Sequence, residues 1–311
     1  MNAYRFDGRN AWEDWGGDLT NIAVGRITVS RYKRGEGRDA VLVTKIGEFI
    51  NPDDDVWGMN AEGKVFCFDR EVRIWRLVEG PTVKSISVGN GGIFGITPAN
   101  EIVAYTALGF KIPGELTNIA MANSAWGINT AGQAFRFNGV GWEHIPGVVL
   151  TTISAGGQAC WGVNGVNEMF RSYGVNWEHI LPGEMGEVRM LSAGISPSSP
   201  SVFGPGGPQS VCWALNAANQ IFLYSNETEP GPPSHGRRGG TNRTMIARTA
   251  WRHIRSEIGK VRRIVAGSAG NCWALNADHQ IFRCVDKKSW AHVPGSLTSI
   301  ASGDGAVWGL H

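Results

Sequence analysis

The sequence predicts an all-β fold, a closed β-propeller of seven four-stranded blades that forms a single domain over residues 1–311. Three observations support this prediction. A short cassette built around an aromatic residue recurs along the whole chain, each copy is surrounded by segments with strand composition, and the two chain ends together supply one complete repeat.

The cassette contains an aromatic residue, then Gly or Ala, an aliphatic residue and a polar residue, as in the CWGVN of residues 160–164. Its seven aromatic residues are Trp57, Phe94, Trp126, Trp161, Trp213, Trp273 and Trp308. They lie roughly 30 to 60 residues apart, which is typical of propeller repeats that carry some insertions.

Four short segments make up each repeat. In the repeat around Trp161 they are residues 148–156, 160–164, 168–173 and 177–183. Their β-branched and aromatic residues, divided by Gly, Asn and Pro, are typical of antiparallel strands, and no segment has the length and periodicity of a helix. The same four segments return in residues 116–147 and 261–295.

The chain ends supply the third observation. The last repeat stops after its second segment at residues 307–311, while residues 4–8 and 11–17 resemble a third and a fourth segment. We therefore expect the N- and C-terminal strands to share one blade, which closes the ring and removes the exposed sheet edges. A six-bladed ring is the alternative if residues 83–114 pack irregularly.

Three insertions interrupt the predicted ring, at residues 25–55, 194–210 and 225–250. The last is rich in Pro, Gly and Ser, so its composition predicts a mobile loop. Residues 237–263 hold nine Lys or Arg and one acid, Glu257. This basic stretch is either a solvated loop or a contact for an anionic glycan or lipid phosphate.

Composition excludes several classes of protein. With 42% hydrophobic and 18% charged residues the chain can bury an ample core, and a net charge of +2 argues against nucleic acid as the main partner. No stretch reaches the ~20 apolar residues of a membrane span. The N-terminus lacks a secretory signal, so we expect a cytoplasmic protein, or one exported without a classical signal peptide. The oligomeric state is left open.

Neither a cofactor nor a metal is expected. The five cysteines lack the close pairing of a zinc site, and the simplest interpretation is reduced thiols, three of them small core residues beside a cassette Trp. Histidines recur one per repeat in the fourth segment, where packing is a better explanation than a metal site, which needs three or four converging ligands. No triad or paired carboxylates recur, so no catalytic residue is predicted and the chain is not expected to be an enzyme.

The repeat resembles a known family. The order W-G-V-N, I-[FY]-R, W-x-x-I-P-G and L-x-x-I-x-x-G is similar to the tectonin repeat of tectonin and tachylectin-type propeller lectins, over nearly the full length. The similarity is strong around Trp126, Trp161, Trp273 and Trp308 and weaker around Phe94. It implies binding of surface glycans, including bacterial lipopolysaccharide and O-methylated sugars, in recognition or defence.

Tryptophan occupies two equivalent positions in the repeat. The cassette Trp residues are expected in the core between blades. The second set lies in the fourth, outermost segment and comprises Trp12, Trp75, Trp142, Trp177, Trp251 and Trp290. For these residues two interpretations stay open, since a flat indole can pack between blades or cover the C–H face of a sugar.

Two polar residues also recur. Arginine follows an aromatic residue in the third segment at Arg5, Arg136, Arg171 and Arg283, and its five donors suit either sugar hydroxyls or a structural bridge to a nearby Glu. Asparagine closes most cassettes, where its amide can recognise hydroxyls or fix the following turn.

The leading hypothesis is a non-enzymatic, multivalent carbohydrate-binding propeller whose partners are glycans or lipopolysaccharide. The alternative is an intracellular protein-interaction scaffold. The candidate ligand-binding residues come from three repeats: Asn129, Arg136 and Trp142; Asn164, Arg171 and Trp177; Asn276, Arg283 and Trp290.

Overall fold

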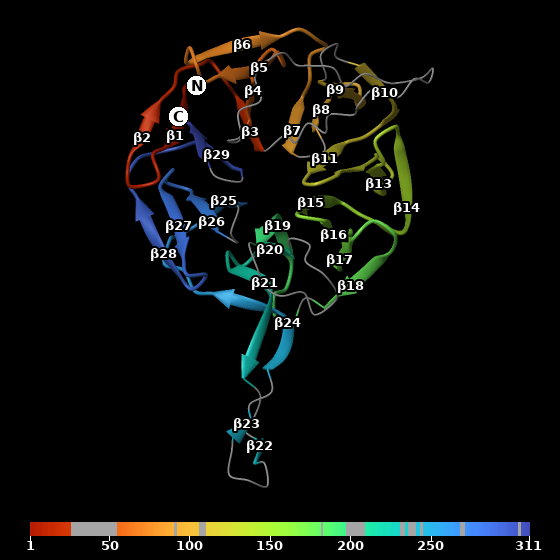
Figure 1. Ribbon diagram of the computed structural model, residues 1–311, viewed down its shortest axis with the longest axis vertical. Coiled ribbons are helices and arrows are strands. Elements are labelled where there is room, and N and C mark those ends of the chain that lie inside the picture. The colour runs from red at the N-terminus through yellow and green to blue at the C-terminus, as the bar shows by residue number, and fades with distance from the viewer. Residues whose placement is uncertain are drawn as a thin grey trace.

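Seven antiparallel sheets of four strands each form a ring around a central axis (Figure 1). The computed structural model describes residues 1–25, 55–89, 92–105, 110–181, 183–196, 209–230, 234–235, 241–242, 245–267, 271–303 and 306–311. No helix occurs within these ranges. The predicted all-β propeller with seven blades is therefore confirmed, and the described strands between Ser85 and Glu115 form a four-stranded sheet of their own, so a six-bladed ring is wrong.

The first strand of each blade lies innermost and the second packs against it (Figure 1). From blade 1 to blade 7, the first strands are β3 (Asn21–Gly25), β7 (Ser85–Gly89), β11 (Asn118–Met121), β15 (Thr152–Gly156), β19 (Val188–Ser196), β25 (Val261–Ala266) and β29 (Ser299–Ser302). The second strands are β4 (Asp55–Met59), β8 (Gly92–Ile96), β12 (Ala125–Ile128), β16 (Ala159–Val163), β20 (Gln209–Asn216), β26 (Cys272–Asn276) and β30 (Val307–Leu310).

The third and fourth strands complete each blade toward the rim. The third strands are β5 (Val65–Asp69), β9 (Glu101–Ala104), β13 (Gln133–Phe137), β17 (Met169–Ser172), β21 (Ile221–Pro230), β27 (Ile281–Val285) and β1 (Ala3–Phe6). The fourth strands are β6 (Ile74–Val78), β10 (Phe110–Glu115), β14 (Trp142–Val149), β18 (Trp177–Ile180), β24 (Met245–Ile254), β28 (Ser289–Val293) and β2 (Trp12–Asp14).

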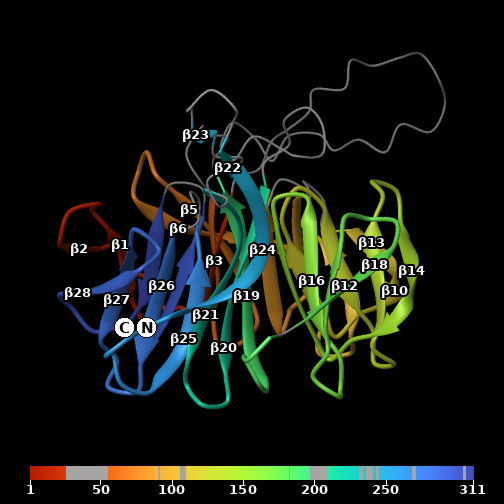
Figure 2. The same ribbon diagram turned by 90° about the horizontal axis from the view of Figure 1, so that it is seen from below.

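The alternating strand direction gives the ring two faces. Every first strand begins at what we call the lower face and ends at the upper face. Consequently the first-to-second and third-to-fourth connections lie at the upper face, and the turns between second and third strands lie at the lower face. The chain leaves its described part at Gly25, Ser196 and Pro230, all at upper-face connections, and the short pair β22 (Ser234–His235) and β23 (Thr241–Asn242) lies beyond this face (Figure 2).

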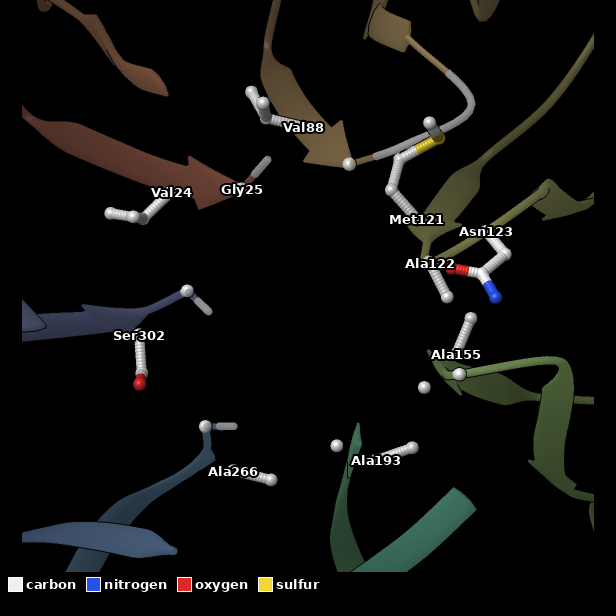
Figure 3. Close-up of a pocket in the computed structure, with 16 residues that line it drawn as sticks. Val24, Gly25, Val88, Met121, Ala122, Asn123, Ala155, Ala193, Ala266 and Ser302 are labelled. Carbon is white, nitrogen blue, oxygen red and sulfur yellow. The ribbon is translucent and has the colours of Figure 1, made fainter. Parts of the chain in front are cut away.

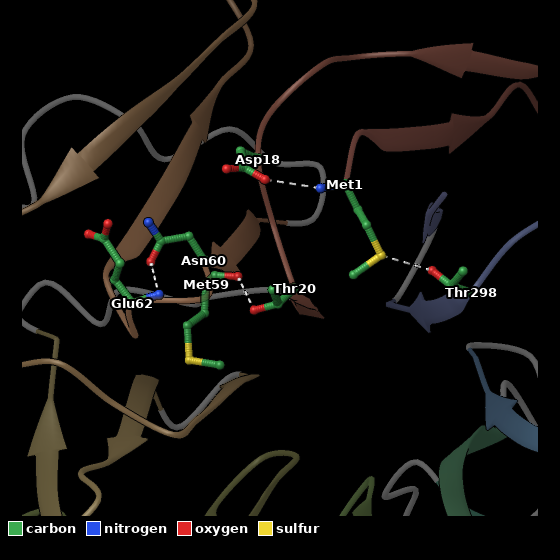
Figure 4. Close-up of polar contacts among 7 residues, drawn as sticks. All are labelled: Met1, Asp18, Thr20, Met59, Asn60, Glu62 and Thr298. Atoms are coloured by element: carbon green, nitrogen blue, oxygen red, sulfur yellow. Dashed lines mark hydrogen bonds and ion pairs between the residues drawn. The ribbon is translucent and has the colours of Figure 1, made fainter.

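Blade 7 closes the ring with strands from both ends of the chain. Its strand order is β2-β1-β30-β29, and Arg5 of β1 lies opposite Trp308 of β30. The N-terminal ammonium of Met1 donates to Asp18 Oδ1 at 3.1 Å, and Thr298 Oγ1 lies 3.2 Å from Met1 Sδ (Figure 4). The predicted sharing of one blade by the two termini is confirmed.

The hydrophobic core lies between blades. Seven clusters of buried residues each combine two neighbouring blades, and each contains a buried cassette aromatic residue. The fourth-strand Trp of one blade packs against the cassette aromatic residue of the preceding blade, with ring centroids 5.8 to 6.4 Å apart. Blade 2 has no Trp in its fourth strand, and Tyr105 takes this place against Trp57, at 6.5 Å.

Small residues after the cassette aromatic residue fit a bulky residue at the start of the first strand. A Cβ on Gly162 would lie 2.5 Å from Leu150 Cδ1, and the pairs Gly58–Leu19, Gly127–Leu116 and Gly309–Leu297 repeat this crowding. In blade 5 the corresponding pair is Ala214 with Val188, and in blade 6 it is Ala274 with Val261. The two members of each pair lie in the same cluster. Leu with Gly and Val with Ala therefore fill similar volumes.

The prediction that residues 225–250 form a mobile loop is wrong for much of the segment. β21 and β24 extend past the ring as a ladder that runs from Ser225 opposite Ala250 to Pro230 opposite Met245 (Figure 1). Pro and Gly are concentrated in residues 230–240, so averaging the composition over the whole segment concealed the second flank, residues 241–250, which contains Thr, Ile and Arg. The first flank, residues 225–229, has no such signal and is fixed by its pairing with the second. The segments 26–54 and 197–208 lie outside the described residues.

Removal of residues 1–16 is expected to destabilise the ring and cause aggregation. The deletion removes β1 and β2, so β30 keeps β29 but loses β1 and exposes an unpaired edge. Size-exclusion chromatography and thermal melting check this. A truncated protein that remains monomeric with an unchanged melting temperature contradicts the closure.

Gly162→Ala is expected to destabilise the protein by about 1–3 kcal/mol through overpacking against Leu150. Adding Leu150→Val should recover part of that loss, because it recreates the Val–Ala combination of blades 5 and 6. Urea unfolding of the two single variants and the double variant measures the coupling. Strictly additive losses would show that the two positions do not share volume.

Candidate functional site

The predicted asparagines fix turns at the lower face. Asn129 Oδ1 accepts from the backbone N–H groups of Ala131 and Gln133 at 3.0 and 2.9 Å, and its Nδ2 donates to the Gln133 side chain. Asn164 and Asn276 make the same pattern of contacts in their own turns. The amides are thus engaged in the turn role that the sequence left open beside hydroxyl recognition.

The predicted tryptophans belong to the contacts between blades. Trp142, Trp177 and Trp290 are half-buried, and each ring packs edge-on against the cassette residue of the preceding blade. In blade 3, Arg136 lies opposite Glu143 while the next residue, Phe137, lies opposite Trp142. Since neighbouring residues of a strand point to opposite faces, Arg136 and Trp142 do not share a site. Arg136 instead shares the boundary to blade 4 with Trp177, because both adjoin Trp126.

Arg171 is a structural bridge. It is buried, and its Nη2 and Nε donate to Glu178 Oε2 at 2.6 and 3.2 Å. Its guanidinium also stacks 5.2 Å from the ring centres of both Trp161 and Tyr173 and 5.4 Å from that of Tyr224. Burial alone lowers the pKa of Arg171, but the bond to Glu178 and the neighbouring tyrosines outweigh burial and raise it above the ordinary value.

Arg136 lies at the equivalent position of blade 3 without an acidic partner. It makes no ion pair with Glu143, which lies opposite it across the sheet, and its one side-chain hydrogen bond is from Nη2 to Ser124 Oγ at 3.3 Å. Its buried Nε has no hydrogen-bond partner. The guanidinium crosses to blade 4 and contacts the backbone at Gly174, which has φ +114. A side chain at Gly174 would occupy the place of the guanidinium.

The remaining arginines have different surroundings. Arg283 is half-buried and lies opposite Ala291, so its own sheet offers no carboxylate. Arg5 lies 5.7 Å from the ring centre of Trp15, which also receives Arg73 at 4.8 Å and packs against Trp308. Trp15, the one Trp outside the two repeated positions, therefore fills the boundary between blades 7 and 1.

Exposed apolar residues flank the boundary between blades 3 and 4. Val140 is 89% exposed and Val175 is 77% exposed, each at the tip of a third-to-fourth turn at the upper face, and Tyr173 is 55% exposed beside Val175. Sequence reasoning missed these residues. The repeated Gly-Val at 139–140 and 174–175 was the available signal. A valine in a surface turn contributes nothing to the core, so its recurrence there indicates a contact surface.

The central axis ends in a small cavity at the upper face. Figure 3 shows the ends of the first strands converging around it, and its volume is about 90 Å³. Gly and Ala dominate its lining, in which Asn123 and Ser302 supply the polar side chains. This lining offers no acid–base pair among the described residues, and no cluster of three His, Cys, Asp or Glu in the described part could hold a metal ion.

The recurring histidines and the cysteines have packing roles. His144, His179, His253 and His292 each lie 5.1 to 5.4 Å from the ring centre of a third-strand Phe, as the packing interpretation predicts. All five cysteines are free thiols, and burial raises the pKa of Cys160 and Cys272 well above the ordinary value. These thiols are not poised for nucleophilic chemistry.

The family comparison agrees with the resemblance in the repeat. The Tectonin domain model matches residues 115–197, which comprise blades 3 and 4 and the first strand of blade 5, and this is consistent with a tectonin-type β-propeller family. None of the curated proteins matches the chain. Within the described residues, no helix has the length and apolar character needed to cross a bilayer.

Solved structures share the fold at low identity. Human WBSCR16 is 12% identical with a TM-score of 0.62, covering 99% of this chain and 98% of its own. Prp20p from Saccharomyces cerevisiae, described with its binding to Gsp1p and histones, is 10% identical with a TM-score of 0.61, covering 82% and 80%. YCF48 from Cyanidioschyzon merolae is 12% identical with a TM-score of 0.53, covering 83% and 91%. At these identities the likeness concerns the fold alone.

Arg171→Ala is expected to lower the free energy of unfolding by about 1–3 kcal/mol, because it removes a charge-assisted bond and a buried stacking partner. Arg136→Ala should cost less, since Arg136 has no acidic partner. Urea unfolding of both variants tests the difference. Equal losses would show that Arg171 is no more a bridge than Arg136.

Proposed function

We propose that this protein is a non-enzymatic, multivalent carbohydrate-binding propeller that recognises surface glycans. The tectonin resemblance suggests bacterial lipopolysaccharide or O-methylated sugars as the ligand class. The Tectonin domain match supports the proposal because it covers blades 3 and 4, where Arg136 lies between exposed turns.

The unpaired guanidinium of Arg136 is the observation that carries the proposal. Arg171 shows how the same position is satisfied when the chain supplies an acid. Arg136 is half-buried, its buried Nε has no hydrogen-bond partner, and among the described residues the one side chain that accepts from it is Ser124. A sugar hydroxyl or carboxylate would provide the missing acceptors without displacing a protein ligand.

The surroundings of Arg136 suit the apolar side of a sugar. Val175 is exposed next to Gly174, which the guanidinium contacts, and Val140 is exposed in the turn that follows the strand of Arg136. The glycine at 174 keeps side-chain bulk away from the guanidinium. A pyranose presents hydroxyls at its edge and C–H groups on its face. The guanidinium of Arg136 could bind the hydroxyls, and the exposed valines of the two turns could contact the C–H groups. We infer that the site is shared between neighbouring blades, with Arg136 from one blade and Trp177 from the next.

Multivalency would come from the ring. Arg283 at the boundary of blades 6 and 7 also lacks a cross-strand acid and is the second candidate position. Arg171 is already engaged by Glu178 and is a weaker candidate, whereas Arg5 packs on Trp15 and its Nε has no hydrogen-bond partner. Two weak sites on one rigid domain raise the effective concentration of the second contact on a dense glycan surface.

Arg136→Ala is expected to reduce binding to a positive glycan at least about ten-fold at one site, the loss expected for charge-assisted hydrogen bonds. A glycan array identifies the ligand, and calorimetry then gives affinity and stoichiometry. Arg9→Ala, which removes an exposed charge elsewhere, is the matched control. Wild-type affinity and stoichiometry in the Arg136→Ala variant would contradict the assignment.

A protein-interaction scaffold is the second candidate, favoured by the extended β21–β24 hairpin, whose paired strands continue past the ring. Prp20p, which shares the fold, is described as binding Gsp1p and histones. Retention on immobilised glycans or bacterial cells separates the two functions. Release by free sugar supports a lectin, whereas no retention supports the scaffold.

A further inference from the structure

A second cavity, of about 170 Å³, lies at the lower face where blades 5, 6 and 7 meet. This volume is several times the ~30 Å³ that one water molecule occupies in the liquid, so a small solute fits. Its polar lining comes from Arg262, Arg263, Asn276, His279 and Thr298, and no Asp or Glu lines it among the described residues. The cavity is therefore strongly cationic.

The two arginines have no acidic partner. Neither Arg262 nor Arg263 makes an ion pair in the described part of the chain, and Asp278, beside His279 in the sequence, is exposed and does not line the cavity. Both side chains remain open to solvent, as the walls of an accessible pocket must be.

The ring itself does not require arginine at these places. At the position of Arg262, four blades have a threonine whose hydroxyl donates to the backbone at the end of the second strand, namely Thr20, Thr117, Thr151 and Thr298, while blades 2 and 5 have Lys84 and Arg189. Figure 4 shows this contact between Thr20 and Met59. At the position of Arg263 the corresponding residues are Asn21, Ser85, Asn118, Thr152, Met190 and Ser299. Paired arginines are peculiar to blade 6.

His279 also departs from the pattern of the ring. It occupies the left-handed position of the lower-face turn, with φ 62, where the other blades that share this turn have Gly63, Asn100, Gly132, Asn167 and Asn219. Histidine, like asparagine, adopts this conformation more often than most side chains, and none of these other blades uses it here. Its Nδ1 lies 3.2 Å from Leu297 O and therefore donates to it, which leaves Nε2 for a ligand.

The other polar lining residues are already satisfied. Asn276 holds its own turn and donates to Ile258 O and Gln280 Oε1, and the Thr298 hydroxyl donates to Leu310 O. Ligand binding in this cavity therefore depends on Arg262, Arg263 and His279. Arg262 and Arg263 are adjacent in β25, but the register shift between Val261 and Arg263 breaks the usual alternation of side chains, and both residues line the cavity. Two guanidinium forks with an imidazole match a dianion with several oxygens better than a carboxylate, which would leave one arginine uncompensated.

We propose that this lower-face cavity is a binding site for a phosphate group, either free phosphate or the phosphate monoester of a larger molecule, held by Arg262, Arg263 and His279. The site is independent of the glycan site, because Arg136 lies at an upper-face turn of blades 3 and 4. Each proposal can fail without affecting the other.

Calorimetric titration of the full chain with sodium phosphate, at fixed ionic strength in a phosphate-free buffer, tests the proposal. We expect one saturable site. The variant Arg262→Thr/Arg263→Asn should bind phosphate at least about ten-fold more weakly, because the loss of one charge-assisted hydrogen bond already corresponds to about a ten-fold loss of affinity. His279→Asn should also bind more weakly while remaining folded, because Asn fits the same turn at 167 and 219.

Both arginine substitutions introduce residues that the ring uses at the same positions in other blades, so the variants are expected to fold, which circular dichroism verifies. Arg9→Gln is the matched charge control and should bind phosphate like the wild type. Titration with glucose 6-phosphate distinguishes the two possible ligands. Tighter binding than inorganic phosphate indicates that the site takes a phosphate monoester, and equal binding indicates that it takes free phosphate. Absence of saturable phosphate binding to the wild type, or equal binding by the double variant, overturns the proposal.

Discussion

The fold depends on one repeated contact, the packing of a fourth-strand aromatic ring against the cassette aromatic residue of the preceding blade. Each sheet alone would expose both faces, and the seven clusters between blades are where the apolar surface is buried. The contact is directional, since each blade gives its cassette residue to the next blade and its outer Trp to the previous one. A ring closed by both termini satisfies every blade, whereas an open array would leave two faces uncovered.

Much of this architecture could be predicted from the sequence because short stretches of neighbouring residues specify it. The cassette marks the second strand, the Gly and Asn of its turn mark the lower face, and the split of one repeat between the ends requires closure. The hairpin of β21 and β24 could not be predicted in this way. A ladder that extends from Ser225 to Pro230 is specified by its pairing with the other flank, and composition averaged over the whole insertion does not contain pairing information.

The candidate site was harder to predict for a geometric reason. Residues of one repeat were grouped because they are near in sequence, but Arg136 and Trp142 point to opposite faces of the sheet, and Asn129 lies at the other end of the blade. The functional neighbourhood is formed by two repeats, and its composition depends on which blade follows which. Arg136 and Arg171 are equivalent in sequence, yet Glu178 satisfies one and Glu143 does not satisfy the other.

Departures from the repeat are therefore more informative about function than the repeat itself. The common residues are explained by packing and turns, since Leu150 fits Gly162, Asn164 holds its turn and the threonines cap the second strands. Residues that break the pattern without a packing gain, such as Arg263 and His279, instead place an unpaired cation and an imidazole at the lower-face cavity. A closed ring tolerates such departures because its seven clusters between blades stabilise it elsewhere, and a bound anion would compensate the cation.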